Sequence, residues 1–152
     1  MAPPDEDFAT AMNALGGGWN RAMGLHILRA TADEVIAECE IGPQHCQPHG
    51  IVHGGVYSSM VETVASVGAA LHAMPNGQSV VGLENHTSFL RAVRSGTLRA
   101  TARPLTRGRR TQVWESTITD ASGRIAATGR VRLLCLEADA VLAGESAKVP
   151  GE

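Results

Sequence analysis

The stretch VYSSMVETVASVGAALHAM, residues 56–74, decides the fold. It combines apolar and small residues with a single formal charge, Glu62. It follows Gly54-Gly55 and precedes Pro75-Asn76-Gly77, and such glycine and proline clusters are typical of helix boundaries. We therefore predict one long helix over residues 56–74. Its many Ser, Ala and Gly residues would let a sheet approach closely, so the pattern predicts a helix buried against a sheet.

Strand-like patterns precede this helix. Residues 25–30 and 34–41 are predicted strands, and every other residue of the second is apolar, which is the period of a strand with one buried face. That face carries Val35, Ala37, Cys39 and Ile41. A short amphipathic helix is predicted over residues 7–15, ending at Gly16-Gly17-Gly18.

Four more strands are predicted after the long helix, over residues 80–90, 96–105, 110–119 and 124–136. The last two are joined by Asp120-Ala121-Ser122-Gly123, a sequence typical of a hairpin turn. Because consecutive hairpins form an antiparallel sheet, the long apolar helix must be buried against that sheet. The sequence predicts an α+β fold, in which a curved antiparallel β-sheet wraps around a long central helix.

The composition fits one soluble globular domain. The chain has 152 residues, 43% hydrophobic and 18% charged, which is enough for a sizeable core. A net charge of −2 argues against a general nucleic-acid binder. The N-terminus does not resemble a signal peptide, and no apolar run reaches the ~18 residues of a membrane span. We expect neither nucleic acid nor a membrane as a partner.

The cysteines and the chain ends complete this outline. Three irregularly spaced cysteines, Cys39, Cys46 and Cys135, fit reduced thiols in the cytoplasm better than a disulfide framework. We expect a tail and short helix at residues 1–21, with residues 1–6 a loose polar tail. The main domain is expected at residues 22–137, and a flexible C-terminal tail at residues 138–152.

Glu62 is the residue that most strongly suggests chemistry. A lone carboxylate is expensive to bury in charged form, so it is either solvated or part of a functional cleft. The polar stripe around it is narrow and holds no second charge, whereas a solvated face usually carries more Lys and Glu. The stripe consists of Ser59, Glu62, Thr63 and Ser66. We interpret Glu62 as a catalytic carboxylate in a cleft, with Ser66 one turn later on the same face.

The start of the helix offers a second functional group. Backbone N–H groups at a helix N-terminus lack partners and lie at the positive end of the helix dipole, so one could bind a developing oxyanion. Gly54 and Glu62 are about 12 Å apart along a helix, so one carbonyl carbon cannot contact both. If both are catalytic, the sequence predicts a homodimer with shared active sites.

Two sequence blocks resemble one family. The first is Gln47-Pro48-His49-Gly50-Ile51-Val52-His53-Gly54-Gly55 with Glu62 and Ser66. The second is Gly82-Leu83-Glu84-Asn85-His86-Thr87-Ser88-Phe89-Leu90-Arg91 with Gly96. Together they resemble the hotdog-fold acyl-CoA thioesterases, closest to the branch with the phenylacetate-pathway and Arthrobacter-type 4-hydroxybenzoyl-CoA thioesterases. The resemblance covers residues 22–137 and implies the hotdog fold.

The resemblance implies catalytic roles for five residues. Glu62 would be the carboxylate, acting as nucleophile or as general base on water, and the Gly54 N–H would polarise the thioester carbonyl. Gln47 would place an amide near the reaction centre from the opposite subunit, and Ser66 would orient water. His53 would shape the loop.

The resemblance also implies a substrate site. Acyl-CoA would be the substrate, with no separate cofactor and no metal, and the protein would form homodimers, often dimers of dimers. Arg91 would contact the nucleotide end of CoA, and Arg109 and Arg110 its phosphates, as suits guanidinium groups. Asn85, Tyr57 and Met60 are further expected substrate-binding residues. Trp19 and Met23 are additional candidates for the acyl end.

Three other readings remain open. His45, Cys46, His49 and His53 could suggest a metal site, although their spacing is a weak zinc pattern. His53 with Glu62 could serve a hotdog enoyl- or hydroxyacyl-CoA hydratase-dehydratase. The domain could also bind acyl-CoA without catalysis. The acyl group, aryl or fatty, stays undecided, as does the role of Glu62 as nucleophile or base.

Overall fold

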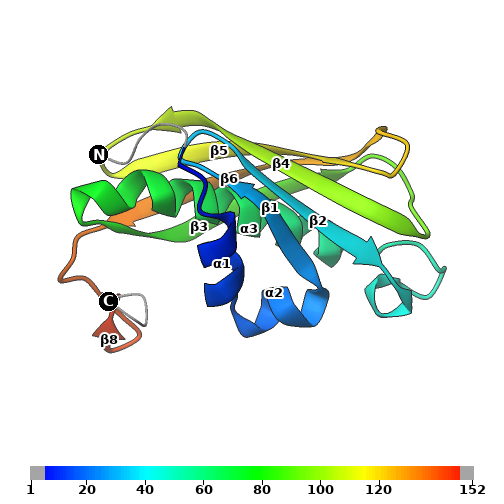
Figure 1. The fold of residues 1–152 in the computed structure, drawn as a ribbon, viewed down its shortest axis with the longest axis horizontal. Helices are drawn as coiled ribbons and strands as arrows, with labels where there is room; N and C mark the ends of the chain where they lie inside the picture. Colours follow the sequence, from blue (N-terminus) through cyan, green and yellow to red (C-terminus); the bar gives the residue numbers. More distant parts are fainter. Residues whose placement is uncertain (1–5, 148–152) are drawn as a thin grey trace.

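The computed structural model describes residues 6–147 and contains the predicted long helix. This helix, α3, covers Gly54–Ala73 and continues into the 3-10 turn Met74–Asn76 (η2). It therefore begins two residues earlier than predicted, with His53 as its N-cap. Figure 1 shows α3 lying across one face of a large curved sheet. The predicted α+β hotdog architecture is confirmed.

The sheet is antiparallel and has six strands in the order β1-β2-β4-β5-β6-β3. The strand bounds lie within two residues of the predicted ones. They are β1 Leu25–Ala30, β2 Val35–Ile41, β3 Ser79–Phe89, β4 Gly96–Arg107, β5 Thr111–Thr119 and β6 Ile125–Leu136. The strand β3 stands at one edge, where β6 is its only strand partner within residues 6–147, although it follows α3 and η2 in the chain.

The core lies between α3 and the sheet. The predicted inner face of β2 is confirmed, because Val35, Ala37, Cys39 and Ile41 are all buried. The fully buried indole of Trp114 on β5 lies against Gly68 of α3, where a Cβ atom would overlap its ring. The small residues of α3 thus allow close contact with the sheet, as the sequence predicts.

The N-terminal segment contains one helix more than predicted. Helix α1, Ala9–Leu15, corresponds to the expected helix, and Phe8, Ala9 and Met12 pack against the core. Helix α2, Gly18–Met23, begins at the last residue of the Gly16-Gly17-Gly18 run, between the predicted helix and the first predicted strand. It has six residues and buries only Met23, so its sequence is too short to show the apolar periodicity of a longer helix.

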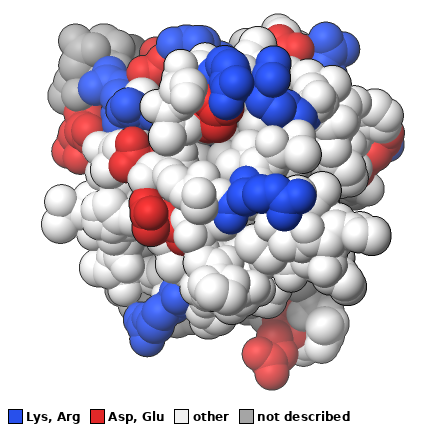
Figure 2. Space-filling view, turned by 90° about the vertical axis from the view of Figure 1, so that its right-hand side faces the viewer, with Lys and Arg blue, Asp and Glu red and all other residues white. Residues whose placement is uncertain are grey.

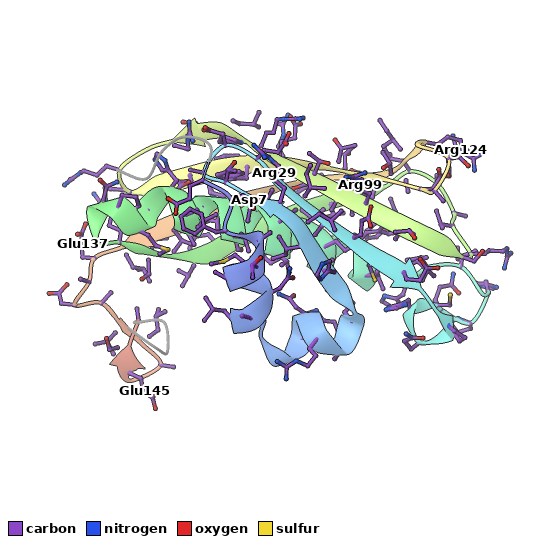
Figure 3. The ribbon with its side chains drawn as sticks, viewed as in Figure 1. Asp7, Arg29, Arg99, Arg124, Glu137 and Glu145 are labelled. Atoms are coloured by element: carbon purple, nitrogen blue, oxygen red, sulfur yellow. The ribbon has the colours of Figure 1, made fainter. Side chains whose placement is uncertain are left out.

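The outer face of the sheet is polar. Its cross-strand ion pairs join Glu38 to Arg99 at 3.8 Å, and Glu115 to Arg130 and Glu84 to Arg132 at 3.2 Å each. Figure 3 shows Arg29 and Arg99 along this side of the sheet. Such exposed pairs stabilise little individually, so the fold depends on the opposite face, which packs on α3.

The remaining segments are short. The expected C-terminal tail contains a small hairpin, β7 Val141–Leu142 and β8 Glu145–Ser146, which Figure 1 shows standing away from the sheet. Residues 148–152 of that expected tail, and residues 1–5 of the expected N-terminal tail, lie outside the described residues. Within 6–147, no helix combines the length and apolarity needed to cross a membrane.

Candidate active site

The carboxylate of Glu62 is half-buried and held by side chains from two elements. Its Oε2 accepts a hydrogen bond of 2.9 Å from Nδ2 of Asn85 on β3, and Asn85 also donates to the Ser58 carbonyl at 3.0 Å. Its Oε1 accepts a longer bond of 3.5 Å from the Ser66 hydroxyl. The predicted Glu62–Ser66 pair is present, but the shorter contact comes from Asn85, which was expected to bind substrate.

Gly82 completes the surroundings of this carboxylate. A Cβ atom at Gly82 would overlap Glu62 Oε1, so the carboxylate lies against the bare backbone of β3. The strand is irregular here, because its register with β6 shifts between Gly82 and Glu84. Bulges are common at sheet edges and beside functional sites, and this one adjoins the only charged side chain of α3.

The other two hydroxyls of the polar stripe bind α2. The Trp19 indole N–H donates to the Ser59 hydroxyl at 3.0 Å, and the Thr63 hydroxyl donates to the Asn20 amide oxygen at 2.9 Å. Glu62 is therefore flanked by α2 on one side and by β3 on the other. Trp19, which was expected near the acyl end, is 65% exposed.

The start of α3 is arranged as a donor site. His53 is the N-cap, and its Nδ1 accepts a 2.8 Å hydrogen bond from the Gly55 N–H. Among the described residues, the Gly54 N–H has no acceptor. It lies at the positive end of a 20-residue helix, where an anionic oxygen is favoured. The capping bond places His53 where the loop meets the first turn of α3, and its role in shaping the loop stays a prediction.

A cavity of about 330 Å³ adjoins Gly54. We call it the Gly54 cavity, and it brings together four predicted site residues, Gln47, Gly54, Tyr57 and Arg91. Its other lining residues are Ile51, Val52, Phe89, Leu90 and Ala92. Glu62 does not line it. The two principal groups of the predicted site therefore belong to different surroundings within one chain.

His45 holds the loop that carries Gln47. Its side chain is buried, its Nδ1 accepts from the Gly42 N–H at 2.9 Å, and its Nε2 lies 2.7 Å from the Met23 carbonyl. Its own carbonyl accepts a 2.9 Å bond from the His53 N–H. His45 thus ties the end of α2 to the residue before Gly54. The sequence alone suggests His45 only as a metal ligand, because its backbone partners are distant in the chain.

The histidines and cysteine of the 45–53 loop do not gather their side chains around one point. In the described part of the chain, no three His, Cys, Asp or Glu side chains converge in a way that could hold a metal ion. His45 and His53 instead use ring nitrogens on the backbone.

A second cavity, of about 460 Å³, lies at the other end of α3. We call it the Arg109 cavity, after the predicted phosphate-binding residue in its wall. Its lining residues are His72, Ala73, Asn76, Gln78, Arg107, Gly108, Arg109, Gln112, Cys135 and Glu137. Burial lowers the pKa of His72, and the nearby Arg107 charge lowers it further, against the opposing effect of Asp33. Arg110 is exposed and does not line this cavity.

The remaining predicted residues differ in accessibility. Met60 is fully buried, Met23 is 5% exposed, and both belong to the core. Tyr57 is 3% exposed but borders the Gly54 cavity, and its hydroxyl donates to the Arg91 carbonyl at 3.4 Å. Figure 2 shows one side of the molecule, on which patches of basic residues stand among uncharged ones.

Comparison with known proteins identifies the family. A sequence model of the Thioesterase superfamily matches residues 49–127. The Rv1847 protein of Mycobacterium tuberculosis, which is named for a proposed esterase activity, is 45% identical over 118 residues, covering 76% of this chain and 84% of the relative. The solved structure of that relative superposes with a TM-score of 0.79 at 43% identity, covering 80% of this chain and 98% of the other.

Two further matches extend this likeness. The 1,4-dihydroxy-2-naphthoyl-CoA hydrolase of Listeria monocytogenes is 33% identical over 113 residues, covering 74% of this chain and 91% of the relative. The structure of the thioesterase HI1161 from Haemophilus influenzae has a TM-score of 0.82 at 29% identity, covering 90% of this chain and 96% of the other. The chain belongs to the Thioesterase superfamily and is a thioester hydrolase.

Proposed function

We propose that this protein is an acyl-CoA thioesterase in which Glu62 of one chain and the Gly54 N–H of a second chain act on the same thioester. One observation carries the proposal. The Gly54 N–H adjoins a cavity that Glu62 does not line, although both belong to α3. A spacing of about 12 Å along the helix prevents one chain from presenting both groups to one carbonyl.

The chemistry follows from the two groups. The thioester oxygen accepts a hydrogen bond from the Gly54 N–H, which stabilises negative charge as it develops. Glu62 either attacks the carbonyl carbon or takes a proton from a water molecule that attacks it. The carbon–sulfur bond breaks and the thiolate leaves as CoA. Where Glu62 is the nucleophile, water then hydrolyses the acyl–Glu62 anhydride and frees the carboxylate. By either route water supplies the oxygen added to the acyl group and the proton taken up by the thiolate. Asn85 keeps the carboxylate in place throughout.

The edge strand β3 supports the shared site. It carries Gly82 and Asn85, which both lie against Glu62, and one of its sides has no strand partner in the part of the chain that the structure describes. A free edge is a natural surface for a second copy. We expect the second chain to lie against this region and to bring its Gly54 cavity, with Gln47, toward Glu62.

The positions of Arg91 and Arg109 suggest that one CoA molecule contacts more than one chain. Arg91 lines the cavity at the start of α3, and Arg109 lines the cavity at its end, about 28 Å away at the rise of an α-helix. If both hold one nucleotide, they come from different chains, as in a dimer of dimers.

A matched pair of substrates tests the role of Arg91 and Arg109. Arg91→Gln and Arg109→Gln raise KM for an acyl-CoA and leave KM unchanged for the same acyl group on N-acetylcysteamine, which lacks the nucleotide.

The first experiment is free-thiol release from a panel of acyl-CoAs. The panel runs from acetyl through crotonyl and palmitoyl to benzoyl, hydroxybenzoyl and phenylacetyl, because one relative is named for an aryl-CoA substrate. Glu62→Gln lowers turnover by about 10²- to 10⁴-fold, whereas Glu115→Gln, on the outer face of the sheet, does not. Equal rates for wild type and Glu62→Gln, or hydration of crotonyl-CoA without release of CoA, contradict the proposal.

A mixing experiment tests the shared site. Glu62→Gln lacks the carboxylate and Gly54→Ala displaces the donor by its overlap with Phe89, so each has low activity alone, but a mixed dimer contains one site with both native groups. Unfolding and refolding an equal mixture therefore restores about a quarter of wild-type activity if the chains pair at random as dimers. An inactive mixture that contains mixed dimers excludes sites shared between chains.

A further inference from the structure

Gly54 does not need to be glycine for its own backbone. It lies in the first turn of α3 and is absent from the glycines with positive φ, which are Gly24, Gly50, Gly77, Gly96, Gly123 and Gly144. In ordinary helical geometry alanine is accepted and favours the helix more than glycine does. Some other feature must therefore require the absence of a side chain at position 54.

That feature is the ring of Phe89. A Cβ atom at Gly54 would lie 2.5 Å from Phe89 Cε2, 2.6 Å from Cζ and 3.2 Å from Cδ2. Distances below 3.0 Å do not occur for real Cβ contacts. The ring of the last residue of β3 is therefore in direct contact with the Cα of Gly54, and it occupies the space that a side chain would need.

The ring is held in this position. The backbone on both sides of Phe89 is fixed, because Phe89 pairs with Ala127 and the Leu90 N–H donates to the Ala126 carbonyl at 2.9 Å. Its ring also packs on Tyr57, with the ring centroids 5.9 Å apart and the planes tilted by 32°. Since Tyr57 is 3% exposed, one side of Phe89 rests on a buried neighbour.

The other side of Phe89 faces ligand space. The residue is 57% exposed and lines the Gly54 cavity. A large apolar side chain there contacts the first turn of α3 and borders the cavity that the Gly54 N–H adjoins.

We propose that Phe89 is a positioning residue, which presses on the first turn of α3 and so aims the Gly54 N–H into the Gly54 cavity. Position 54 is glycine because the Phe89 ring occupies its side-chain space. The catalytic half of this inference rests on the proposed function. The steric half concerns the fold alone.

A double-mutant cycle between positions 54 and 89 tests both halves. Melting temperature, kcat and KM are measured for Gly54→Ala, Phe89→Ala and the double variant. Gly54→Ala lowers the melting temperature and the turnover in the wild-type background, because the methyl group overlaps the ring. In the Phe89→Ala background, Gly54→Ala lowers neither the melting temperature nor the turnover, because the space for the methyl group is open. An equal cost of Gly54→Ala in both backgrounds overturns the steric half.

The kinetic readout isolates the positioning role. Phe89→Ala lowers kcat by about 10- to 100-fold with KM nearly unchanged, because a misplaced donor loses mainly transition-state binding. Phe89→Leu, which keeps part of the ring's bulk, recovers part of that loss. A rise in KM with kcat unchanged shows a substrate-binding wall instead, and overturns the positioning role.

Leu90→Ala is the matched control. Leu90 lines the same cavity but is absent from the three nearest neighbours of a Cβ at position 54, so this variant does not relieve Gly54→Ala. Relief by Leu90→Ala contradicts a specific role of Phe89. If the wild type releases no thiol from any acyl-CoA, the proposed function fails, while the melting-temperature cycle still decides the steric half.

Discussion

Gly82 on the edge strand leaves open the space that the carboxylate of Glu62 on α3 occupies. A methyl group at Gly82 would overlap Oε1 of that carboxylate, and Asn85 on the same strand donates to Oε2. One strand therefore both makes room for the carboxylate and holds it. The orientation of Glu62 is set by β3 as much as by its own helix.

Gly82→Ala is expected to reduce thioesterase activity by displacing Glu62. A shift of about 1 Å in a catalytic group can cost about 10²-fold in rate, so a comparable fall in kcat is expected while the sheet stays folded. Thiol release and circular dichroism measure the two effects. Gly18→Ala is the matched control, because a Cβ at Gly18 meets nothing within 4 Å. Full activity of Gly82→Ala would show that the carboxylate is not needed in this position.

The two hydrogen bonds to Glu62 are expected to differ in importance. Asn85 donates at 2.9 Å, whereas Ser66 donates at 3.5 Å, and hydrogen bonds weaken with distance. Asn85→Ala is expected to lose about 1.5–3 kcal/mol of transition-state stabilisation, as for a bond to a charged group. Ser66→Ala is expected to lose less. The kcat/KM values of the two variants with one acyl-CoA test which loss is larger. A larger loss for Ser66→Ala would mean that orienting water matters more than the Asn85 hydrogen bond to the carboxylate.

The close contact of Gly68 and Trp114 predicts a stability effect remote from catalysis. The Trp114 ring is fully buried and fills the space over Gly68. Gly68→Ala overpacks this contact and is expected to lower the free energy of unfolding by about 1–3 kcal/mol, despite the better helix propensity of alanine. Urea denaturation measures the change. No loss, or a gain, would show that the helix and sheet can separate slightly without penalty.

The sequence predicts those helices, strands and turns whose own residues show a hydrophobic periodicity or a turn motif. The apolar length of α3, the alternation in β2 and the turn at Asp120 each appear in neighbouring residues, so local pattern is enough. The narrow stripe around Glu62 likewise indicates a special environment before any contact is known.

The missed features depend on contacts distant in the chain. Helix α2 is short and begins in a run of glycines, and its polar bonds are to Ser59 and Thr63, about 40 residues away. The contacts of Glu62 with Gly82 and Asn85 join residues 20 and 23 positions apart. No local pattern encodes such pairs, which exist only once the edge strand has folded beside the helix.

A buried hydroxyl gives a stabilising substitution. Ser116 on β5 is 1% exposed, and its hydroxyl has no hydrogen-bond partner among the protein atoms of residues 6–147. Because burying an unpaired polar group is unfavourable, Ser116→Ala is expected to raise the free energy of unfolding by about 1 kcal/mol. Thermal and urea unfolding both measure it. Destabilisation by this variant would show that the hydroxyl makes a bond that the protein atoms do not provide.

Asp7 is expected to link stability to acid pH. Its Oδ1 accepts from the Ala30 N–H and the Ala9 N–H at 2.9 Å each, and Figure 3 shows it beside Arg29. The Ala30 hydrogen bond, aided by the Ala9 bond and the Arg29 charge and opposed by burial, lowers the pKa of Asp7 below its ordinary 3.8.

The unfolded chain therefore binds the proton more readily than the folded one. The contribution of Asp7 to stability is complete above pH 3.8 and is lost as the pH falls through the lower pKa of the folded state. Melting temperature between about pH 2 and 6 is expected to fall less steeply on the acid side for Asp7→Asn than for the wild type. Asp139→Asn, which removes an exposed carboxylate near the C-terminus, is the control and should keep the wild-type slope. If the melting temperatures of Asp7→Asn and wild type fall equally steeply with decreasing pH, the contact between Asp7 and β1 does not distinguish the folded from the unfolded state.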